Sequence, residues 1–171
     1  LFHKKMKQLT LLIACICTVA CLQAENGYRL WLRYDKVSNP ALLQQYRQQI
    51  TGIVYKDSNA ASNELMTGLA GLLDKKIYRQ ANGSIVVKVA AGLPKEGFSI
   101  RTAGGKITIS GGSDAGVLYG VFHFLRLLQT QQNISRLDIT SSPAISLRLL
   151  NHWDNLDRTV ERGYAGNSIW D

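Results

Sequence analysis

The side chains best suited to chemistry lie in one stretch, residues 151–171. It contains two of the three tryptophans, four acids, two arginines and a histidine. Carboxylates, amides and guanidinium groups bind polar ligands through hydrogen bonds, and an indole ring offers a large apolar face with one N–H donor. The stretch therefore predicts a place where a polar ligand is recognised. The side chains in question are His152, Trp153, Asp154, Asn155 and Arg158.

The run "AISLRLL", residues 144–150, leads straight into these polar side chains. One interpretation is a buried parallel strand that reaches the C-terminal rim of a barrel, where barrel enzymes build their active sites. The other is a helix cap followed by a loop, in which Trp153 is a packing residue. The residues alone leave both interpretations open.

The first 24 residues have the pattern of a targeting segment. Three lysines between positions 4 and 7 precede an apolar run that is too short to span a bilayer of roughly 30 Å. The pattern predicts a signal peptide over residues 1–24, cleaved after Ala24, and hence an exported, periplasmic or extracellular protein. "TVAC" also resembles the box before a bacterial lipoprotein cysteine, which would make Cys21 a lipidation site.

Cysteine and charge limit the remaining possibilities. All three cysteines (Cys15, Cys17 and Cys21) lie in the apolar run, so we expect no disulfide and no thiolate metal site in the mature domain. Losing the three leader lysines lowers the formal charge from +8 to +5. The remaining basic residues are scattered and not interleaved with aromatics, so nucleic acid is not an expected partner. A mildly basic surface favours an acidic substrate or glycan.

The glycine-rich stretch "SGGSDAG" does not predict a cofactor site. Its spacing matches neither the P-loop nor the dinucleotide fingerprint, and a turn from a hairpin into a helix needs glycines anyway. We expect no cofactor.

His123, which stands between two phenylalanines in a helical pattern, is expected to pack rather than to act as a ligand or base.

Between the two ends, hydrophobic periodicity predicts alternating strands and helices. The first two helices are expected at 40–50, opened by Asn39 and Pro40, and from a cap at Ser58 or Ser62 to Ile77. A third helix, 113–131, has Ser113 as its cap, Asp114 in its first turn and an apolar face. The residues of that face are Leu118, Val121, Phe122, Leu125 and Leu128. The strands are expected at residues 28–35, 51–56, 84–91, 97–104 and 106–112.

These elements predict an α+β fold. The last three strands are expected to be antiparallel neighbours, with a turn at Gly104 and Gly105. The whole is expected to be a small two-layer domain, a mixed or antiparallel sheet with packed helices, over residues 25–143. Residues 144–171 would then begin a (β/α)8 barrel.

Three stretches carry a resemblance to a known family. "RLLNHWDNLDRTVERGYAGNSIWD" resembles the signature that opens the catalytic barrel of the family 67 glycoside hydrolases, the α-glucuronidases. "GYRLWLRYD" and "GSDAGVLYGVFHFLRLLQT" are similar to the start and the long helix of the N-terminal domain in that family. The likeness runs from about Tyr28 to Asp171, so the chain resembles the N-terminal fragment of a longer enzyme.

The resemblance implies an exported enzyme that removes α-1,2-linked glucuronic acid, or its 4-O-methyl ether, from xylan fragments with inversion. The catalytic carboxylates of such enzymes lie on later barrel strands, so no residue of this chain is expected to be catalytic. Trp153, Asp154, Asn155 and Arg158 are the expected substrate-binding residues, with the indole as a platform and the guanidinium as a partner for a carboxylate.

The expected partners are glucuronoxylan oligosaccharides, the remainder of the barrel and, in the full-length enzyme, a second copy in a homodimer. Two other functions stay open. One is a non-catalytic carbohydrate-binding or accessory domain, and the other is a related hydrolase for another acidic glycan.

Overall fold

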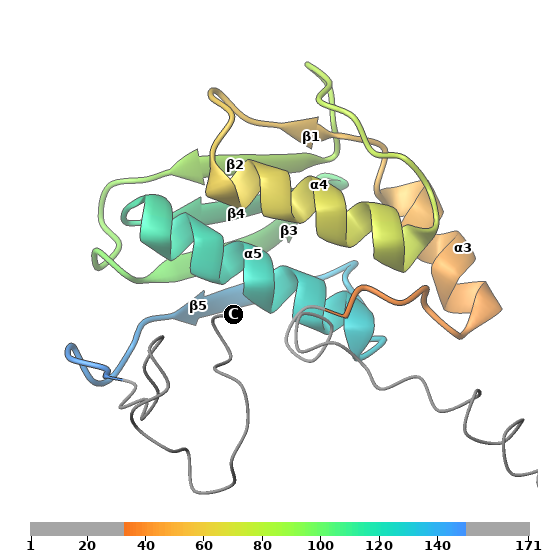
Figure 1. The fold of residues 1–171 in the computed structure, drawn as a ribbon. Coiled ribbons are helices and arrows are strands. Elements are labelled where there is room, and N and C mark those ends of the chain that lie inside the picture. Colours follow the sequence, from red (N-terminus) through yellow and green to blue (C-terminus); the bar gives the residue numbers. More distant parts are fainter. Residues whose placement is uncertain (1–32, 150–171) are drawn as a thin grey trace, which may run out of the picture.

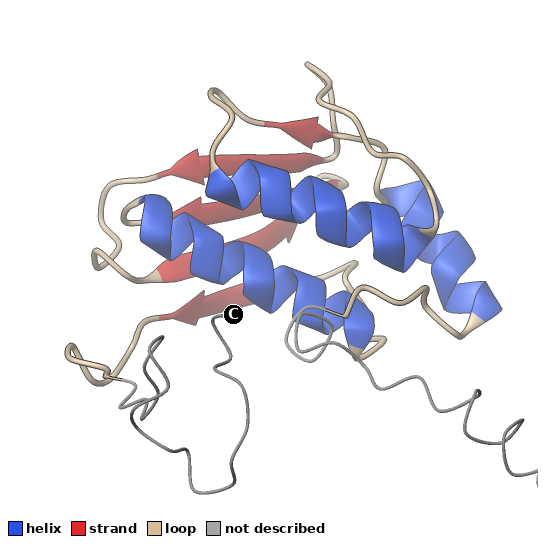
Figure 2. Cartoon of the chain, in the orientation of Figure 1, coloured by secondary structure: helices blue, strands red, loops and turns tan. Residues whose placement is uncertain are grey.

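The computed structural model describes residues 33–149, which form an α+β domain with a five-stranded sheet and three helices. Helices α4 (Ala60–Leu73) and α5 (Asp114–Gln129) lie side by side across one face of the sheet, and α3 (Pro40–Gln49) lies beyond one end of α4 (Figure 1). The two layers are clear when the chain is coloured by element type (Figure 2). The elements in order are α3 Pro40–Gln49, β1 Ile53–Val54, α4 Ala60–Leu73, β2 Ile85–Val89, β3 Phe98–Ala103, β4 Lys106–Gly111, α5 Asp114–Gln129 and β5 Asp138–Ser141.

The strand order is β1-β2-β4-β3-β5, which makes the sheet mixed. Strands β1, β2 and β4 run parallel, whereas β3 runs antiparallel to both β4 and β5. The register aligns apolar side chains across the sheet, because Val87 pairs with Ile109, Ile109 with Ile100, and Ile100 with Ile139. This row forms part of the apolar side of the sheet that the helices cover.

The expectation of three antiparallel neighbours is wrong for β2. Strand β4 lies between β2 and β3, and β2 pairs with β4 in parallel. The alternation of apolar side chains is the same in either arrangement, so periodicity could not choose between them. The β3–β4 hairpin is confirmed, since Gly104 and Gly105 both have positive φ (55° and 76°), as a two-residue hairpin turn requires.

The capping residues in the sequence predicted the starts of α3 and α5 correctly, but not the start of α4. Asn39 caps α3 by accepting from the Leu42 N–H at 3.1 Å, and Ser113 caps α5, as predicted. Helix α4 is capped by Asn59, so the predicted caps at Ser58 and Ser62 are wrong. Ser62 instead occupies the third helical position and completes a reciprocal pair of hydrogen bonds with Asn59.

The ends and faces of the helices also differ in part from the prediction. Helix α4 ends at Leu73 because Asp74 adopts a left-handed conformation (φ 47°), so Ile77 lies beyond it although it is still buried. On α5, Phe124 is buried whereas Phe122 is 37% exposed, and Leu118 is half-buried.

Both ends of the described sheet region differ from the expected pattern. Residues 33–35 of the predicted first strand form no strand, and residues 28–32 lie outside the described part. Strand β5 was not predicted, because three of its four side chains are exposed and its apolar signal is weak. Residues 144–149 form no helix or strand, so the predicted barrel start is not shown. The signal peptide at 1–24 lies outside the described residues.

Two glycines let α5 approach the sheet closely. A Cβ on Gly111 would lie 2.1 Å from the backbone N of Val117, and one on Gly120 would lie 2.9 Å from Cγ2 of Ile109. The resulting core is continuous between the sheet and the helices. Its largest fully buried side chains include Tyr46, Phe124, Ile53, Leu65, Leu69, Ile100, Ile109 and Leu125. Among residues 33–149, no helix has both the length and the apolar character needed to cross a membrane.

Tyr46 gives the core a measurable dependence on pH. Its side chain is fully buried and its hydroxyl donates to the Gln132 carbonyl. Burial raises the pKa of Tyr46 from 10.0 to about 12, so its contribution to stability is complete below pH 10 and is lost as the pH rises towards 12. Tyr46→Phe should lower the free energy of unfolding by about 1 kcal/mol below pH 10.

Urea denaturation at pH 9, 10 and 11 checks this expectation. The stability gap between the native protein and Tyr46→Phe should shrink above pH 10, by up to about 1.4 kcal/mol per pH unit. Tyr78→Phe is the matched control, because Tyr78 is 60% exposed. A Tyr46→Phe gap that stays constant from pH 9 to 11 would contradict the assignment.

The corrected cap of α4 makes a second prediction. Asn59→Ala removes the acceptor for the Ser62 N–H, which it binds at 3.0 Å, and should cost about 1 kcal/mol of stability. For a domain of this size, that corresponds to a fall in Tm of roughly 3–6 °C. Ser58→Ala is the control, since within residues 33–149 the Ser58 hydroxyl donates a hydrogen bond to the Asn63 side chain and does not cap the helix. A greater loss of Tm in Ser58→Ala than in Asn59→Ala would show that the cap is misassigned.

Candidate functional site

The four predicted substrate-binding residues lie outside the described part of the chain. Trp153, Asp154, Asn155 and Arg158 all fall within residues 150–171. Their roles therefore stay predictions. Residues 33–149 themselves form several hollows, each built from side chains that are far apart in the sequence.

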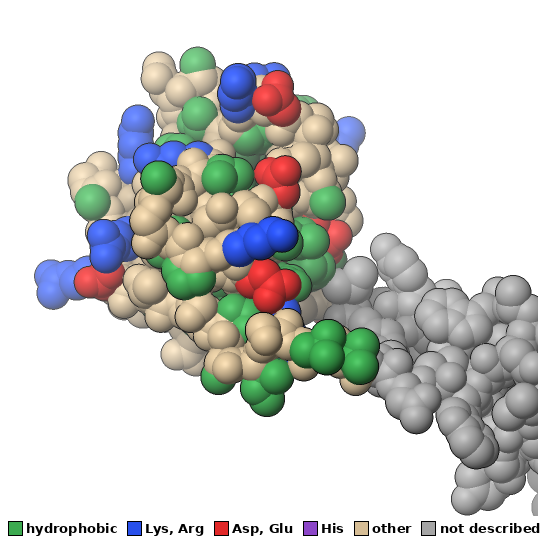
Figure 3. Space-filling view, turned by 90° about the vertical axis from the view of Figure 1, so that its left-hand side faces the viewer, with side chains coloured by type: hydrophobic (Ala, Val, Ile, Leu, Met, Phe, Trp, Pro, Cys, Tyr) green, Lys and Arg blue, Asp and Glu red, His purple; other side chains and the backbone are tan. Residues whose placement is uncertain are grey.

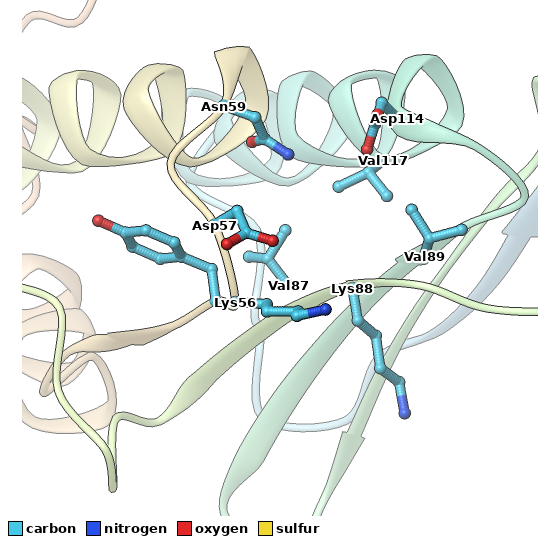
Figure 4. Close-up of a pocket in the computed structure, with 9 residues that line it drawn as sticks. Lys56, Asp57, Asn59, Val87, Lys88, Val89, Asp114 and Val117 are labelled. Carbon is cyan, nitrogen blue, oxygen red and sulfur yellow. The ribbon is translucent and has the colours of Figure 1, made fainter.

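The first hollow lies where β1 and β2 end and where α4 and α5 begin (Figure 4). Parallel strands direct their carboxyl ends to one edge of a sheet, and ligands of open α/β sheets bind at such edges. The pocket has a volume of about 400 Å³. Its lining residues are Tyr55, Lys56, Asp57, Asn59, Val87, Lys88, Val89, Asp114 and Val117.

Figure 4 shows which elements supply the polar groups of this pocket. Asn59 is the N-cap of α4 and Asp114 is the first residue of α5. Lys56 and Asp57 come from the segment after β1, and Lys88 extends away from the centre. Within residues 33–149, no ion pair joins the two lysines to the two aspartates. The charges are exposed and of both signs. Such a pocket can bind a polar ligand, but it does not hold an acid and a base against each other.

The second hollow is a shallow groove of about 540 Å³ on the face of the sheet that the helices leave open. The register places Lys88, Ser110, Ser99 and Thr140 side by side across four strands. The three hydroxyl groups make no hydrogen bond within the described residues. This row could donate to and accept from a ligand that is rich in hydroxyl groups.

The third hollow, of about 410 Å³, is mostly apolar and lies between β3, α5 and the segment after β5. Phe98 and Tyr119 form its wall, and Arg148 closes it through an ion pair to Glu96 with an N–O distance of 2.8 Å. It has the character of a packing surface and not of a site for a polar substrate.

The other residues considered from the sequence have packing roles. The His123 ring lies 5.3 Å from the Phe98 ring, and burial, followed by the nearby Arg126 charge, lowers the pKa of His123. The glycines of "SGGSDAG" allow close packing, since a Cβ on Gly112 would lie 2.1 Å from the Pro94 carbonyl oxygen. No group of His, Cys, Asp and Glu side chains in residues 33–149 could hold a metal ion.

Charges of both signs are interspersed on the face drawn in Figure 3.

The pockets could not be predicted from the sequence. They bring together residues that belong to no short motif, and the parallel β2–β4 pairing that aligns them was itself not foreseen.

Comparison with known proteins identifies the family of the chain. The model of the glycosyl hydrolase family 67 N-terminus matches residues 30–124, and that of the family 67 middle domain matches residues 127–171. A protein named "Probable alpha-glucuronidase A" from Aspergillus oryzae is 34% identical over 89% of this chain and 21% of its own length. "Alpha-glucuronidase A" from Aspergillus tubingensis is 30% identical over 89% of this chain and 20% of its own length.

The chain thus spans about a fifth of the length of these curated relatives. Among solved structures, a family GH115 4-O-methyl-alpha-glucuronidase with specificity for decorated arabinogalactans matches at 16% identity with a TM-score of 0.47. That match covers 56% of this chain and 18% of that one. The family resemblance is confirmed by the sequence matches: with the N-terminal model alone covering more than half of its residues, this chain belongs to glycosyl hydrolase family 67.

Proposed function

We propose that this chain is the N-terminal part of an exported α-glucuronidase. The complete enzyme would hydrolyse α-1,2-linked glucuronic acid, or its 4-O-methyl ether, from xylan oligosaccharides with inversion. The observation that carries the proposal is the succession of two family 67 models along residues 30–124 and 127–171, in the order N-terminus then middle domain. The names of the relatives support the activity.

The carboxyl groups of the described domain support a catalytic centre elsewhere. An inverting glycosidase needs a general acid and a general base about 6.5–9.5 Å apart on opposite sides of the bond that is cleaved. Glu64, Glu96 and Asp138 are each bound to a neighbouring phenol or guanidinium group. Asp74 accepts a hydrogen bond from Lys36 at 2.9 Å, and this bond lowers the pKa of Asp74. These four carboxyl groups are each engaged by a neighbouring side chain of the fold.

The substrate contacts would then come from the middle domain. We propose that residues 144–171 begin the catalytic barrel and that Trp153 forms a platform for the sugar or its methyl ether. Asp154 and Asn155 would hydrogen-bond the sugar hydroxyls, and Arg158 would bind the glucuronate carboxylate through a bidentate fork. Export is proposed from the segment 1–24, where three lysines precede a short apolar run.

One observation favours a second candidate function, a carbohydrate-binding accessory domain. The open face of the sheet carries a row of free hydroxyl groups, with the Lys88 ammonium at one end. A groove of this kind suits a glycan with an acidic substituent. Binding of glucuronoxylan oligosaccharides by the 171-residue chain alone would favour this candidate.

A hydrolysis assay tests the main proposal. The protein assayed is this chain extended by a complete family 67 middle domain. It should release 4-O-methylglucuronic acid from substituted xylo-oligosaccharides, and NMR of the first product should show the inverted anomer. The 171-residue chain should release none, because we expect the catalytic carboxylates to lie on later strands of the barrel. No release by the complete protein would contradict the activity, and a retained anomer would contradict the mechanism.

Trp153→Ala in the complete protein tests the substrate contact in the same assay. A platform residue borders a cavity, so kcat/KM should fall tenfold or more, which is about 1.4 kcal/mol, while Tm stays unchanged. If Trp153 packs in a core instead, the truncation should cost about 3–5 kcal/mol of stability. Trp170→Ala is the matched control. A large loss of Tm with normal kcat/KM per folded molecule would contradict the proposed role.

A further inference from the structure

The segment that follows β5 is anchored to the domain by Arg148. Its Nη2 lies 2.8 Å from Oε2 of Glu96, and its Nη1 donates to the Ile145 carbonyl at 2.5 Å. Hydrogen bonds to Glu96 and then to Tyr119 raise the pKa of Arg148. Glu96 precedes β3 and Tyr119 is on α5, so one guanidinium group ties the segment to both layers of the fold.

The mostly apolar hollow of about 410 Å³ lies directly under this anchor. Phe98 and Tyr119 supply its wall, and Pro143 and Arg148 supply its edge from the segment after β5. The hollow is therefore formed jointly by the folded domain and by the chain that leaves it. An apolar surface of this kind is stabilised when another apolar group covers it.

Exposed apolar side chains are concentrated on α5 and on the segment after β5, two of the elements that line the hollow. Large hydrophobic residues are exposed at seven positions of the described chain, and five of these lie on α5 or in residues 145–149. Tyr119 and Phe122 are one helical turn apart and share a face of α5. Ile145, Leu147 and Leu149 alternate along the segment and are 67%, 71% and 83% exposed. Figure 3 shows hydrophobic side chains at the lower edge of the described part.

The segment that continues from Leu149 has the composition to cover this surface. Apart from Trp153, which is proposed above as a substrate platform, residues 150–171 contain six large apolar side chains, which are Leu150, Leu156, Val160, Tyr164, Ile169 and Trp170. Because Arg148 holds the chain two residues before this segment, its effective concentration at the hollow is high, and weak apolar contacts suffice to occupy it.

We propose that residues 150–171 dock on the surface formed by Phe98, Tyr119, Phe122 and the segment 143–149. In this arrangement the Arg148–Glu96 ion pair sets the direction in which the middle domain leaves the N-terminal domain. The ion pair is partly exposed, with side-chain exposures of 42% and 35%, so its role is to orient the segment and not to stabilise the fold. This inference does not depend on which glycan the enzyme hydrolyses.

Tryptophan fluorescence tests the proposal in the 171-residue chain. All three tryptophans lie outside residues 33–149, so in a Trp31→Phe/Trp153→Phe background only Trp170 emits. Glu96→Arg places two guanidinium groups together and should shift the docking equilibrium by roughly fivefold. The emission should move to longer wavelength, and quenching by acrylamide should increase.

The charge-swapped variant Glu96→Arg/Arg148→Glu should restore the native emission and quenching. Asp138→Arg is the matched control, because it removes the Arg101–Asp138 pair of the same sheet, at 3.0 Å, without touching the docking face. It should leave both readouts unchanged. Arg148→Gln breaks the ion pair from the segment side and keeps the test valid if Glu96→Arg perturbs the domain, which far-UV circular dichroism would reveal.

Three results would overturn the proposal. The first is unchanged quenching in both Glu96→Arg and Arg148→Gln. The second is a charge-swapped variant that fails to restore the native signal while it keeps the fold. The third is quenching that depends on protein concentration together with a dimer in sedimentation, which would assign the surface to a second copy of the chain.

Discussion

The close approach of β4 to α5 is the constraint on which the rest of the structure depends. The strand ends at Gly111 and the helix begins at Asp114, so the chain reverses direction within one tight connection. A Cβ on Gly111 would lie 2.1 Å from the backbone N of Val117 and 2.4 Å from the backbone C of Gly116. Because the obstacle is backbone and not a flexible side chain, only a glycine fits without moving the helix.

This contact determines where the other elements can pack. It holds α5 over the centre of the sheet, where Phe124, Leu125 and Val121 fill the core. Helix α4 then packs beside α5, and it approaches so closely that a Cβ on Gly68 would lie 2.6 Å from Cδ1 of Leu125. The hollows at the edges of the domain are consequences of this arrangement, since α4, α5 or the strand that leads into α5 lines each of them.

The sequence predicted the features that depend on a few neighbouring residues. Caps at Asn39 and Ser113 and the turn at Gly104 and Gly105 follow from local hydrogen bonding and backbone conformation, and all are confirmed. The parallel β2–β4 pairing was missed because it depends on long-range order, to which a period-two pattern is insensitive. Asn59 was missed because its neighbours Ser58 and Ser62 are equally good capping types.

The candidate sites were less predictable than the fold. The clearest chemical signal in the sequence, around Trp153, lies outside the described residues. Arg148 and Glu96 are separated by more than fifty positions, and neither belongs to a motif, so only the folded chain brings them together. Family membership predicts where the catalytic groups belong, whereas geometry indicates how the first domain is joined to the next.

Replacing Gly111 with Ala tests the central constraint most directly, with Ser110→Ala as the neighbouring control on the opposite face of β4. If β4 and α5 meet backbone to backbone, Gly111→Ala should lower the free energy of unfolding by about 3 kcal/mol or more in urea denaturation, because a rigid core accommodates an added methyl poorly. Ser110→Ala should change it by less than about 0.5 kcal/mol. A Gly111→Ala variant as stable as the native protein would show that the helix is free to shift and would contradict this account of the fold.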